Sequence, residues 1–207
     1  MGLIPTMIDL QGKRVVVVGG GIIAERKINN IISAKPKITL ISPNITPKLQ
    51  TLVDHGQIKW LKKNVSSQDL KEAFLIIAAT NKEEVNQQIV AEAPDYALIN
   101  AASDAEAGNV QFPIYLQRGK LSIAISTSGA SPILAKKIKQ KLEKTYDESY
   151  ENYLDFLFEV RTMIKNAKLD REEKQTLLTE VVTNDFMNAA QQTKYILSLQ
   201  QKLKKRD

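Results

Sequence analysis

Four valines followed by three glycines constrain the fold of this chain more than any other stretch. Residues 14–27 read RVVVVGGGIIAERK. The valine run predicts a buried strand, and Ile28, Ile31 and Ile32 recur after the glycines at helical spacing. A strand that enters a helix through a glycine-rich turn is typical of nucleotide-binding α/β folds. We therefore expect the chain to begin with such a fold.

Each small residue of this turn has a separate physical task. Gly19 permits the tight turn, Gly21 allows a pyrophosphate to approach the backbone, and Ala24 lets the helix pack closely on the strand. The N-terminus of the helix adds unpaired N–H groups and the positive end of its dipole. The sequence predicts a dinucleotide site here, with a purely structural glycine turn as the alternative.

The same alternation of strand and helix continues through the first half of the chain. Further apolar runs predict strands at 38–41, 58–61, 75–79 and 97–101. Amphipathic segments predict helices at 24–33, 47–55 and 82–93. Strands separated by helices favour a parallel sheet covered on both faces, so the predicted fold class is α/β, with a Rossmann-type doubly wound parallel sheet.

The alternation of predicted strands and helices ends near residue 112. Two further strands are predicted at 112–115 and 121–126, and almost everything from residue 131 onward is predicted to be helical. The last three predicted helices cover 150–165, 171–184 and 185–203.

The carboxyl ends of the strands supply more candidates for cofactor binding. Ser42 and Pro43 follow the second strand, where an Asp or Glu usually holds the adenosine ribose, and Thr80 and Asn81 follow the fourth strand. Because no acidic residue follows the second strand, this position does not decide between NAD and NADP. The predicted cofactor-binding residues are Gly19, Gly21, Ile22, Ile23, Ala24, Ser42, Pro43, Thr80 and Asn81.

Composition narrows the possible classes of function. The chain has no cysteine and a single histidine, His55, which excludes disulfides, thiolate chemistry and a metal site built from several histidines. The N-terminus lacks the pattern of a signal peptide, and no apolar run approaches the roughly 20 residues of a membrane span. We expect a cytoplasmic protein with no membrane association.

The net charge of +6 raises the possibility of a nucleic-acid partner. Much of the positive charge lies at 136–144 and in the tail at 202–206. Leu203 interrupts the basic tail and no aromatic platform or base-reading motif accompanies it, so we expect no nucleic-acid binding.

Beyond the glycine turn, several short motifs follow one another along the chain. They are DLQGKR at 9–14, AERK at 24–27, AATN at 78–81, VN at 85–86, FP at 112–113, and STSGASP at 126–132 with LAK at 134–136. In this order they resemble the siroheme-synthase dehydrogenase family, which contains precorrin-2 dehydrogenases, some of which also act as sirohydrochlorin ferrochelatases. The resemblance covers about residues 5–143, and the C-terminal helices agree with it in character only.

The resemblance implies an activity, a cofactor and an organisation into domains. The implied reaction is the oxidation of precorrin-2 to sirohydrochlorin by a homodimer, with NAD+ as the hydride acceptor. The implied domains are an NAD-binding Rossmann domain at 1–113, a dimerisation region at 114–145 and a helical C-terminal domain at 146–207. Some relatives then insert Fe2+, and a single histidine favours a dehydrogenase alone without deciding the question.

In the resembling enzymes an aspartate shortly after the fifth strand is the key polar residue, in the order Asn-Val-Val-Asp. Here the stretch reads Asn100-Ala-Ala-Ser-Asp104, so the acid comes one residue late and Ser103 takes its place. A carboxylate at this position would accept the proton that is lost when the macrocycle is oxidised. The predicted catalytic residues are therefore Asp104 and Ser103.

The motif STSGASP predicts a second binding turn. Ser131 before Pro132 is typical of a helix start, with a serine N-cap and a proline at the first helical position. Hydroxyl groups and free N–H groups at a helix N-terminus also suit carboxylates, which fringe precorrin-2. A plain helix cap is the alternative. The predicted substrate-binding residues are Asn100, Ser126, Thr127, Ser128, Gly129 and Ser131.

Glu25, Arg26 and Lys27 are interpreted as residues that bridge to neighbouring elements rather than contact the substrate. A second hypothesis, from a different class of function, is a dimeric regulatory module that senses NAD. The motifs AERK and STSGASP argue against a sensor, because sensing requires neither of them.

Overall fold

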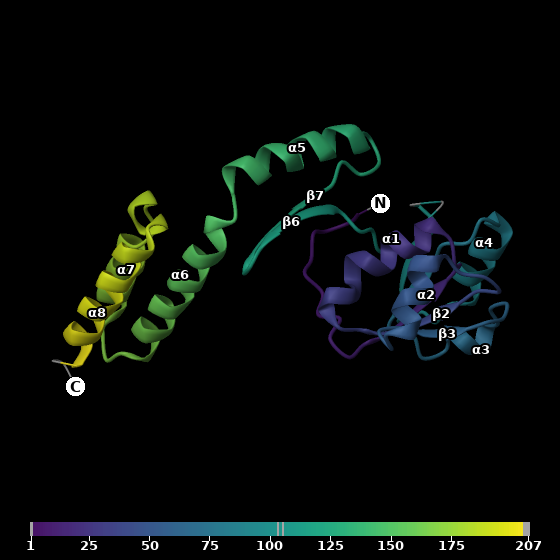
Figure 1. The fold of residues 1–207 in the computed structure, drawn as a ribbon, viewed down its shortest axis with the longest axis horizontal. Coiled ribbons are helices and arrows are strands. Elements are labelled where there is room, and N and C mark those ends of the chain that lie inside the picture. The colour runs from purple at the N-terminus through teal and green to yellow at the C-terminus, as the bar shows by residue number, and fades with distance from the viewer. Residues whose placement is uncertain (1, 103, 105, 205–207) are drawn as a thin grey trace. The chain divides into compact units, whose positions relative to one another are not determined.

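The computed structural model describes residues 2–102, 104 and 106–204. The chain forms two compact units, Met1–Phe112 and Pro113–Asp207 (Figure 1). Each unit has its own secondary structure and its own buried core. The sequence-based division at 113 and 145 into three domains stays a prediction.

The first unit is built on a five-stranded parallel sheet with the strand order β3-β2-β1-β4-β5. Its strands are β1 (Arg14–Val18), β2 (Lys37–Ile41), β3 (Lys59–Leu61), β4 (Leu75–Ala78) and β5 (Leu98–Ala101). Val18, the last residue of β1, pairs with Ile41 of β2 on one side and with Ala78 of β4 on the other. The chain order reverses at β1, and ligands bind at the carboxyl ends of the strands at such a point.

Helices cover both faces of this sheet, as the doubly wound prediction requires. They are α1 (Ile22–Ile31), α2 (Pro47–Asp54), α3 (Ser67–Leu70) and α4 (Glu83–Glu92), with a short 3-10 helix η1 (Ile32–Ala34) after α1. Val15 and Val17 pack in one core cluster with residues of α1 and α2. Val16 and Val18 pack in a second cluster with residues of α3 and α4. The unbroken valine run therefore reflects a strand buried on both faces.

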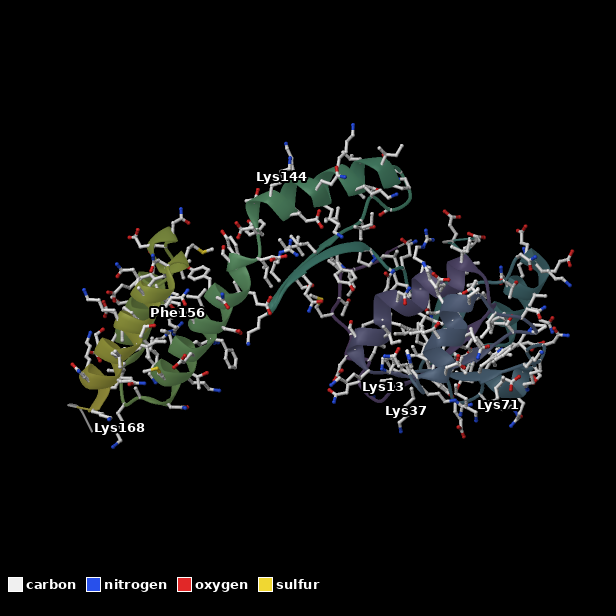
Figure 2. The ribbon with its side chains drawn as sticks, in the orientation of Figure 1. Lys13, Lys37, Lys71, Lys144, Phe156 and Lys168 are labelled. Carbon is white, nitrogen blue, oxygen red and sulfur yellow. The ribbon has the colours of Figure 1, made fainter. Side chains whose placement is uncertain are left out.

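The second unit begins with an antiparallel hairpin, β6 (Ile114–Arg118) and β7 (Leu121–Ile125). Gly119 turns this hairpin with a φ of 51°, in the left-handed region that favours glycine. The helices that follow are α5 (Pro132–Thr145), α6 (Ser149–Asn166), α7 (Arg171–Glu180), the 3-10 helix η2 (Asn184–Met187) and α8 (Ala189–Lys204). Phe156 of α6, labelled in Figure 2, lies in the core that α6, α7 and α8 share.

Most predicted ranges differ from the observed elements by one or two residues, and the clearest differences lie at the start of the second unit and in its last helices. The strand expected from residue 112 begins at Ile114, and the helix expected to reach residue 184 ends at Glu180. The continuous helix expected at 185–203 is a 3-10 helix followed by α8. The break comes at Asn188, whose Oδ1 accepts a hydrogen bond from the backbone N–H of Ala190 at 2.9 Å. Such a side-chain cap starts a new helix.

Within the described residues, no helix combines the length and the apolar character that a membrane crossing demands.

Candidate functional site

The glycine turn between β1 and α1 is shaped by close backbone contacts. Gly19 has a φ of +114°, and a Cβ built there would lie 2.3 Å from the carbonyl oxygen of Ala79. At Gly20 a Cβ would lie 1.9 Å from the carbonyl oxygen of Asn44. Side chains are therefore excluded at both positions, by the end of β4 and by the loop after β2 respectively.

Gly21 differs from the two glycines before it, because a Cβ there would meet nothing within 4 Å. It is the N-cap of α1, and no side chain caps the helix at this end. Ala24, a residue of α1, is fully buried, as its predicted role in packing the helix on the strand requires. Open space in front of uncapped N–H groups fits the pyrophosphate of a dinucleotide. Ile22 and Ile23 flank this space as exposed apolar side chains.

Glu25 and Lys27, two charged residues of the AERK motif on α1, contact residues outside this helix. The Glu25 carboxylate accepts a hydrogen bond from the Thr46 hydroxyl at 2.8 Å and pairs with Lys48 Nζ at 3.3 Å. The Lys27 ammonium lies 5.1 Å from the centroid of the Phe112 ring. Burial, and then the neighbouring charge of Arg26, hold the Lys27 pKa below its usual value. Glu25 and Lys27 therefore bridge to neighbouring segments, as we expected from the sequence.

Ser42, which directly follows β2, makes hydrogen bonds with other residues of the first unit. The Ser42 hydroxyl donates to the carbonyl oxygen of Asn44 at 2.7 Å, and the Ser42 carbonyl accepts from the indole Nε1 of Trp60 at 2.9 Å. Ser42 is buried, whereas Pro43 and Asn44 are exposed. Since the one hydroxyl hydrogen of Ser42 is used inside the loop, Ser42 can offer a ribose only a hydrogen-bond acceptor.

The end of β4 is organised by Asn86, which is almost completely buried on α4. Its Oδ1 lies 3.1 Å from the Thr80 backbone N–H and 2.8 Å from the Thr80 hydroxyl, and its Nδ2 donates to the Thr80 carbonyl at 3.1 Å. Asn86 therefore supports this turn, as the sequence suggested. Because the Thr80 side chain is engaged here, exposed Asn81 and the backbone are the groups left for a cofactor.

Asn100, on β5, is 4% exposed and donates from Nδ2 to the carbonyl oxygen of Val110 at 2.8 Å. Its Oδ1 is buried and receives no hydrogen bond from the described part of the chain. A buried acceptor without a donor is costly, so an N–H or O–H group of a ligand would be stabilised there.

The loop after β5 carries the predicted acid. Asp104 is exposed, and its Oδ1 accepts a hydrogen bond from the Glu106 backbone N–H at 2.8 Å. Ser103 lies outside the described residues. The loop returns to β5 through Asn109, whose Oδ1 accepts from the Ile99 N–H at 2.7 Å and whose Nδ2 donates to the Ala97 carbonyl at 3.0 Å.

The anchor at Asn109 is absent from the sequence-based prediction. The pair Gly108-Asn109 signals a turn but not its attachment. A Cβ at Gly108 would lie 2.4 Å from the carbonyl oxygen of Ile99, so only glycine allows the loop to approach the strand this closely.

The turn at 126–131 lies in the second unit. Ser131 caps α5, since its hydroxyl oxygen accepts from the Leu134 N–H at 3.1 Å. The hydroxyl oxygens of Thr127 and Ser126 accept in the same way from the N–H groups of Ser131 and Ser128. All three hydroxyls act here as acceptors of backbone hydrogens, which leaves their own hydrogens available for a carboxylate.

The backbone of the same turn is unusual. Ser128 has a φ of 50° and Gly129 a φ of 84°, both in the left-handed region. Left-handed backbone at a non-glycine residue is uncommon and concentrates at functional turns. The turn is therefore both a helix cap and a candidate anion site, so neither alternative from the sequence excludes the other.

Three family models match the chain in sequence order. A model described as "Putative NAD(P)-binding" matches residues 6–114, and one described as "Sirohaem biosynthesis protein central" matches residues 118–145. A model described as "SirC C-terminal domain" matches residues 150–195. The first of these covers more than half of the chain and includes the glycine turn.

Curated proteins similar to this chain include two precorrin-2 dehydrogenases. The protein from Priestia megaterium is 39% identical over 87% of this chain and 89% of its own length. The protein from Bacillus subtilis is 38% identical over 77% of this chain and 98% of its own length. A siroheme synthase from Zymomonas mobilis is 34% identical over 89% of this chain, but that match spans only 39% of the longer relative.

A solved structure titled "SirC, precorrin-2 dehydrogenase" superposes with a TM-score of 0.84 at 36% identity, covering 96% of this chain and all of the other.

Proposed function

The chain belongs to the precorrin-2 dehydrogenase family, and from that premise we propose that it oxidises precorrin-2 to sirohydrochlorin with NAD+. The observation that carries the proposal is the glycine turn at 19–21, where an open space faces the uncapped N-terminus of α1. The relatives that share this chain over most of its length are named for the same reaction.

The oxidation removes two hydrogen atoms from the macrocycle. One leaves as a hydride and the other as a proton, so precorrin-2 and NAD+ give sirohydrochlorin, NADH and H+. The bound nicotinamide supplies the acceptor for the hydride. The protein must therefore hold the macrocycle and receive the proton.

Asp104 is the group we assign to the proton. Its Oδ1 is occupied by the Glu106 N–H, which orients the carboxylate and leaves Oδ2 to act as the base. Asn109 attaches the far end of this loop to Ile99 and Ala97. Asn100 lies near the end of β5, and its Oδ1 has no hydrogen-bond donor among the described residues, so we assign it to a polar hydrogen of the bound ligands.

The turn at 126–131 is assigned to the carboxylates of precorrin-2. Hydroxyl hydrogens from Ser126, Thr127 and Ser131, together with the N-terminus of α5, offer hydrogen bonds and positive potential to an anion. The lysines of α5, of which Lys144 is labelled in Figure 2, add positive charge along the same helix.

We assign NAD as the cofactor, the hydride acceptor that the family resemblance implies. Ser42, Pro43 and Asn44, which follow β2, include neither an acid for a ribose nor an arginine for a 2′-phosphate. We further propose a cytoplasmic homodimer formed through residues 114–145. Ile133 and Leu134 of α5 support this, since they are 70% and 50% exposed and dimer interfaces bury apolar side chains of this kind.

The test is an anaerobic assay with precorrin-2 and purified protein, in which NAD+ and NADP+ are supplied separately. We expect NADH and the sirohydrochlorin spectrum to appear together. Addition of Fe2+ to the product then measures ferrochelatase activity. Binding of NAD+ without any oxidation of precorrin-2 would instead support the NAD-sensing module.

Asp104→Asn tests the assigned base, with Glu106→Gln as a control in the same loop. We expect kcat to fall by about 100-fold or more for Asp104→Asn, the usual contribution of a general base. The affinity for NAD+ should stay unchanged in both variants. Equal kcat values for Asp104→Asn and the unmodified protein would show that another group takes the proton.

A further inference from the structure

The loop at residues 42–46, which follows β2, lies directly against the glycine turn. The Thr46 N–H donates to the carbonyl oxygen of Gly20 at 3.0 Å. The carbonyl oxygen of Asn44 and the Ser42 hydroxyl oxygen occupy the place that a side chain at Gly20 would need. In dinucleotide folds this loop holds the adenosine ribose, so its position affects cofactor binding.

One carboxylate fastens this loop to α1. The Thr46 hydroxyl donates to Glu25 Oε2 at 2.8 Å and accepts from the Leu49 N–H at 3.3 Å, as the N-cap of α2. Glu25 is therefore connected through a single hydroxyl to the start of α2. The Glu25 side chain is 12% exposed, so this hydrogen bond is largely shielded from water.

The same carboxylate cancels a positive charge. Lys48, the second residue of α2, places Nζ 3.3 Å from Glu25 Oε1, and its side chain is 81% exposed. Lys48 is the first basic residue after the loop, and a basic residue near the end of β2 is the feature that accommodates the 2′-phosphate of NADP. With Glu25 beside it, the pair carries no net charge.

We propose that Glu25 determines the choice of cofactor: it fastens the 42–46 loop to the glycine turn and neutralises Lys48, so that the site accepts ribose hydroxyls and rejects a 2′-phosphate. This rests on the proposed NAD-dependent function. The discriminating carboxylate of a dinucleotide fold usually ends the second strand, whereas here the first helix provides it.

Two roles of Glu25 can be separated by substitution. Glu25→Gln keeps an acceptor for the Thr46 hydroxyl and removes only the charge. Glu25→Ala removes both the acceptor and the charge. Glu25→Gln combined with Lys48→Gln removes both charges and keeps the acceptor. Glu72→Gln is the matched control, because Glu72 also pairs with a basic residue, Arg14, at the opposite end of β1.

The measurement is the dissociation constant of each purified variant for NAD+ and for NADP+, by calorimetry and without precorrin-2. Trp60, the single tryptophan, donates to the Ser42 carbonyl and reports on the loop by its fluorescence. For Glu25→Gln we expect the affinity for NADP+ relative to NAD+ to rise by about fivefold, the upper end of the range for a surface charge pair, and we expect added salt to reduce this change.

The other variants complete the test. The double variant should return the ratio to within about twofold of the unmodified protein, because the cation is gone. Glu25→Ala should weaken NAD+ binding itself and change the Trp60 emission. Glu72→Gln should change neither the affinity for NADP+ relative to NAD+ nor the Trp60 emission.

Two negative results have different meanings. If the unmodified protein binds neither dinucleotide, the proposed function fails. If it binds NAD+ but Glu25→Gln leaves the NADP+/NAD+ ratio unchanged, or if it already prefers NADP+, the role of Glu25 is overturned while the dinucleotide site stands.

Discussion

Replacing Gly20 by alanine tests how the glycine turn is built. The new Cβ would lie 1.9 Å from the Asn44 carbonyl oxygen and 2.9 Å from the Ser42 hydroxyl oxygen. Ordinary contact begins at 3.4 Å, so the 42–46 loop must withdraw by about 1.5 Å. The φ of Gly20 lies outside the left-handed region, so the penalty is one of contact and not of backbone strain.

The magnitude follows from the contacts that this movement breaks. Overpacking costs about 1–3 kcal/mol, and loss of the hydrogen bond from Thr46 N–H to Gly20 adds about 1 kcal/mol. A loss of roughly 2–4 kcal/mol should lower the unfolding midpoint of a unit of this size by roughly 10 °C. Thermal unfolding followed by circular dichroism and by Trp60 fluorescence measures it.

Gly21→Ala is the matched variant one residue further along. Its Cβ would meet nothing within 4 Å and its φ of −89° suits alanine. We therefore expect stability within about 0.5 kcal/mol of the unmodified protein, but weaker NAD+ binding because the methyl group enters the space assigned to the pyrophosphate. Equal unfolding temperatures for Gly20→Ala and Gly21→Ala would show that contact with the 42–46 loop does not require glycine at position 20.

Three further predictions concern other parts of the molecule. Asn86→Ala removes the hydrogen bonds that Asn86 makes to Thr80 and should cost about 1–3 kcal/mol in urea unfolding, with Gln87→Ala on the exposed face of α4 as a control. Ser131→Ala removes the cap of α5 and should cost about 1 kcal/mol, also measurable by urea unfolding. Burial and the charge of Glu180 raise the pKa of Tyr195 to about 12 from its usual 10.0. The folded chain then keeps a proton that the unfolded chain releases, so stability should fall as the pH rises from 10 to 12, and Tyr195→Phe should flatten that part of the stability profile.

The fold could be predicted from the sequence because its signals are local. The alternation of apolar runs and amphipathic segments predicted the five parallel strands, and the four successive apolar residues of β1, Val15 to Val18, reflect burial on both faces. Helix α3 was missed because it has only four residues. The capping pattern Ser66-Ser-Gln-Asp69 was the available signal, and both of its hydrogen bonds are present.

The candidate site could be predicted only where each residue acts within its own turn. Ala24 falls into this class, as do the positive φ of Gly19 and the cap at Ser131. Gly20 has no task in the turn itself, and its need for glycine comes from Asn44, which lies in a different loop.

The partners of Glu25 also lie in a different segment of the chain and could not be predicted from the sequence. The AERK motif indicated that its charged residues bridge to neighbouring elements, but not that Glu25 meets Thr46 and Lys48. Such pairs depend on how α1 lies beside the 42–46 loop. The spacing of residues within either segment does not predict that arrangement. Asn109, which anchors the loop that carries Asp104, was missed for the same reason.

In the function proposed here, this chain oxidises precorrin-2 by hydride transfer to a dinucleotide held at its glycine turn. The most direct test is an anaerobic single-turnover experiment with enzyme in excess over precorrin-2 and with NAD+ present. We expect one NADH for each sirohydrochlorin formed, and a parallel loss of both signals in Gly21→Ala. Sirohydrochlorin that forms without NADH, or at the same rate in Gly21→Ala, would contradict it.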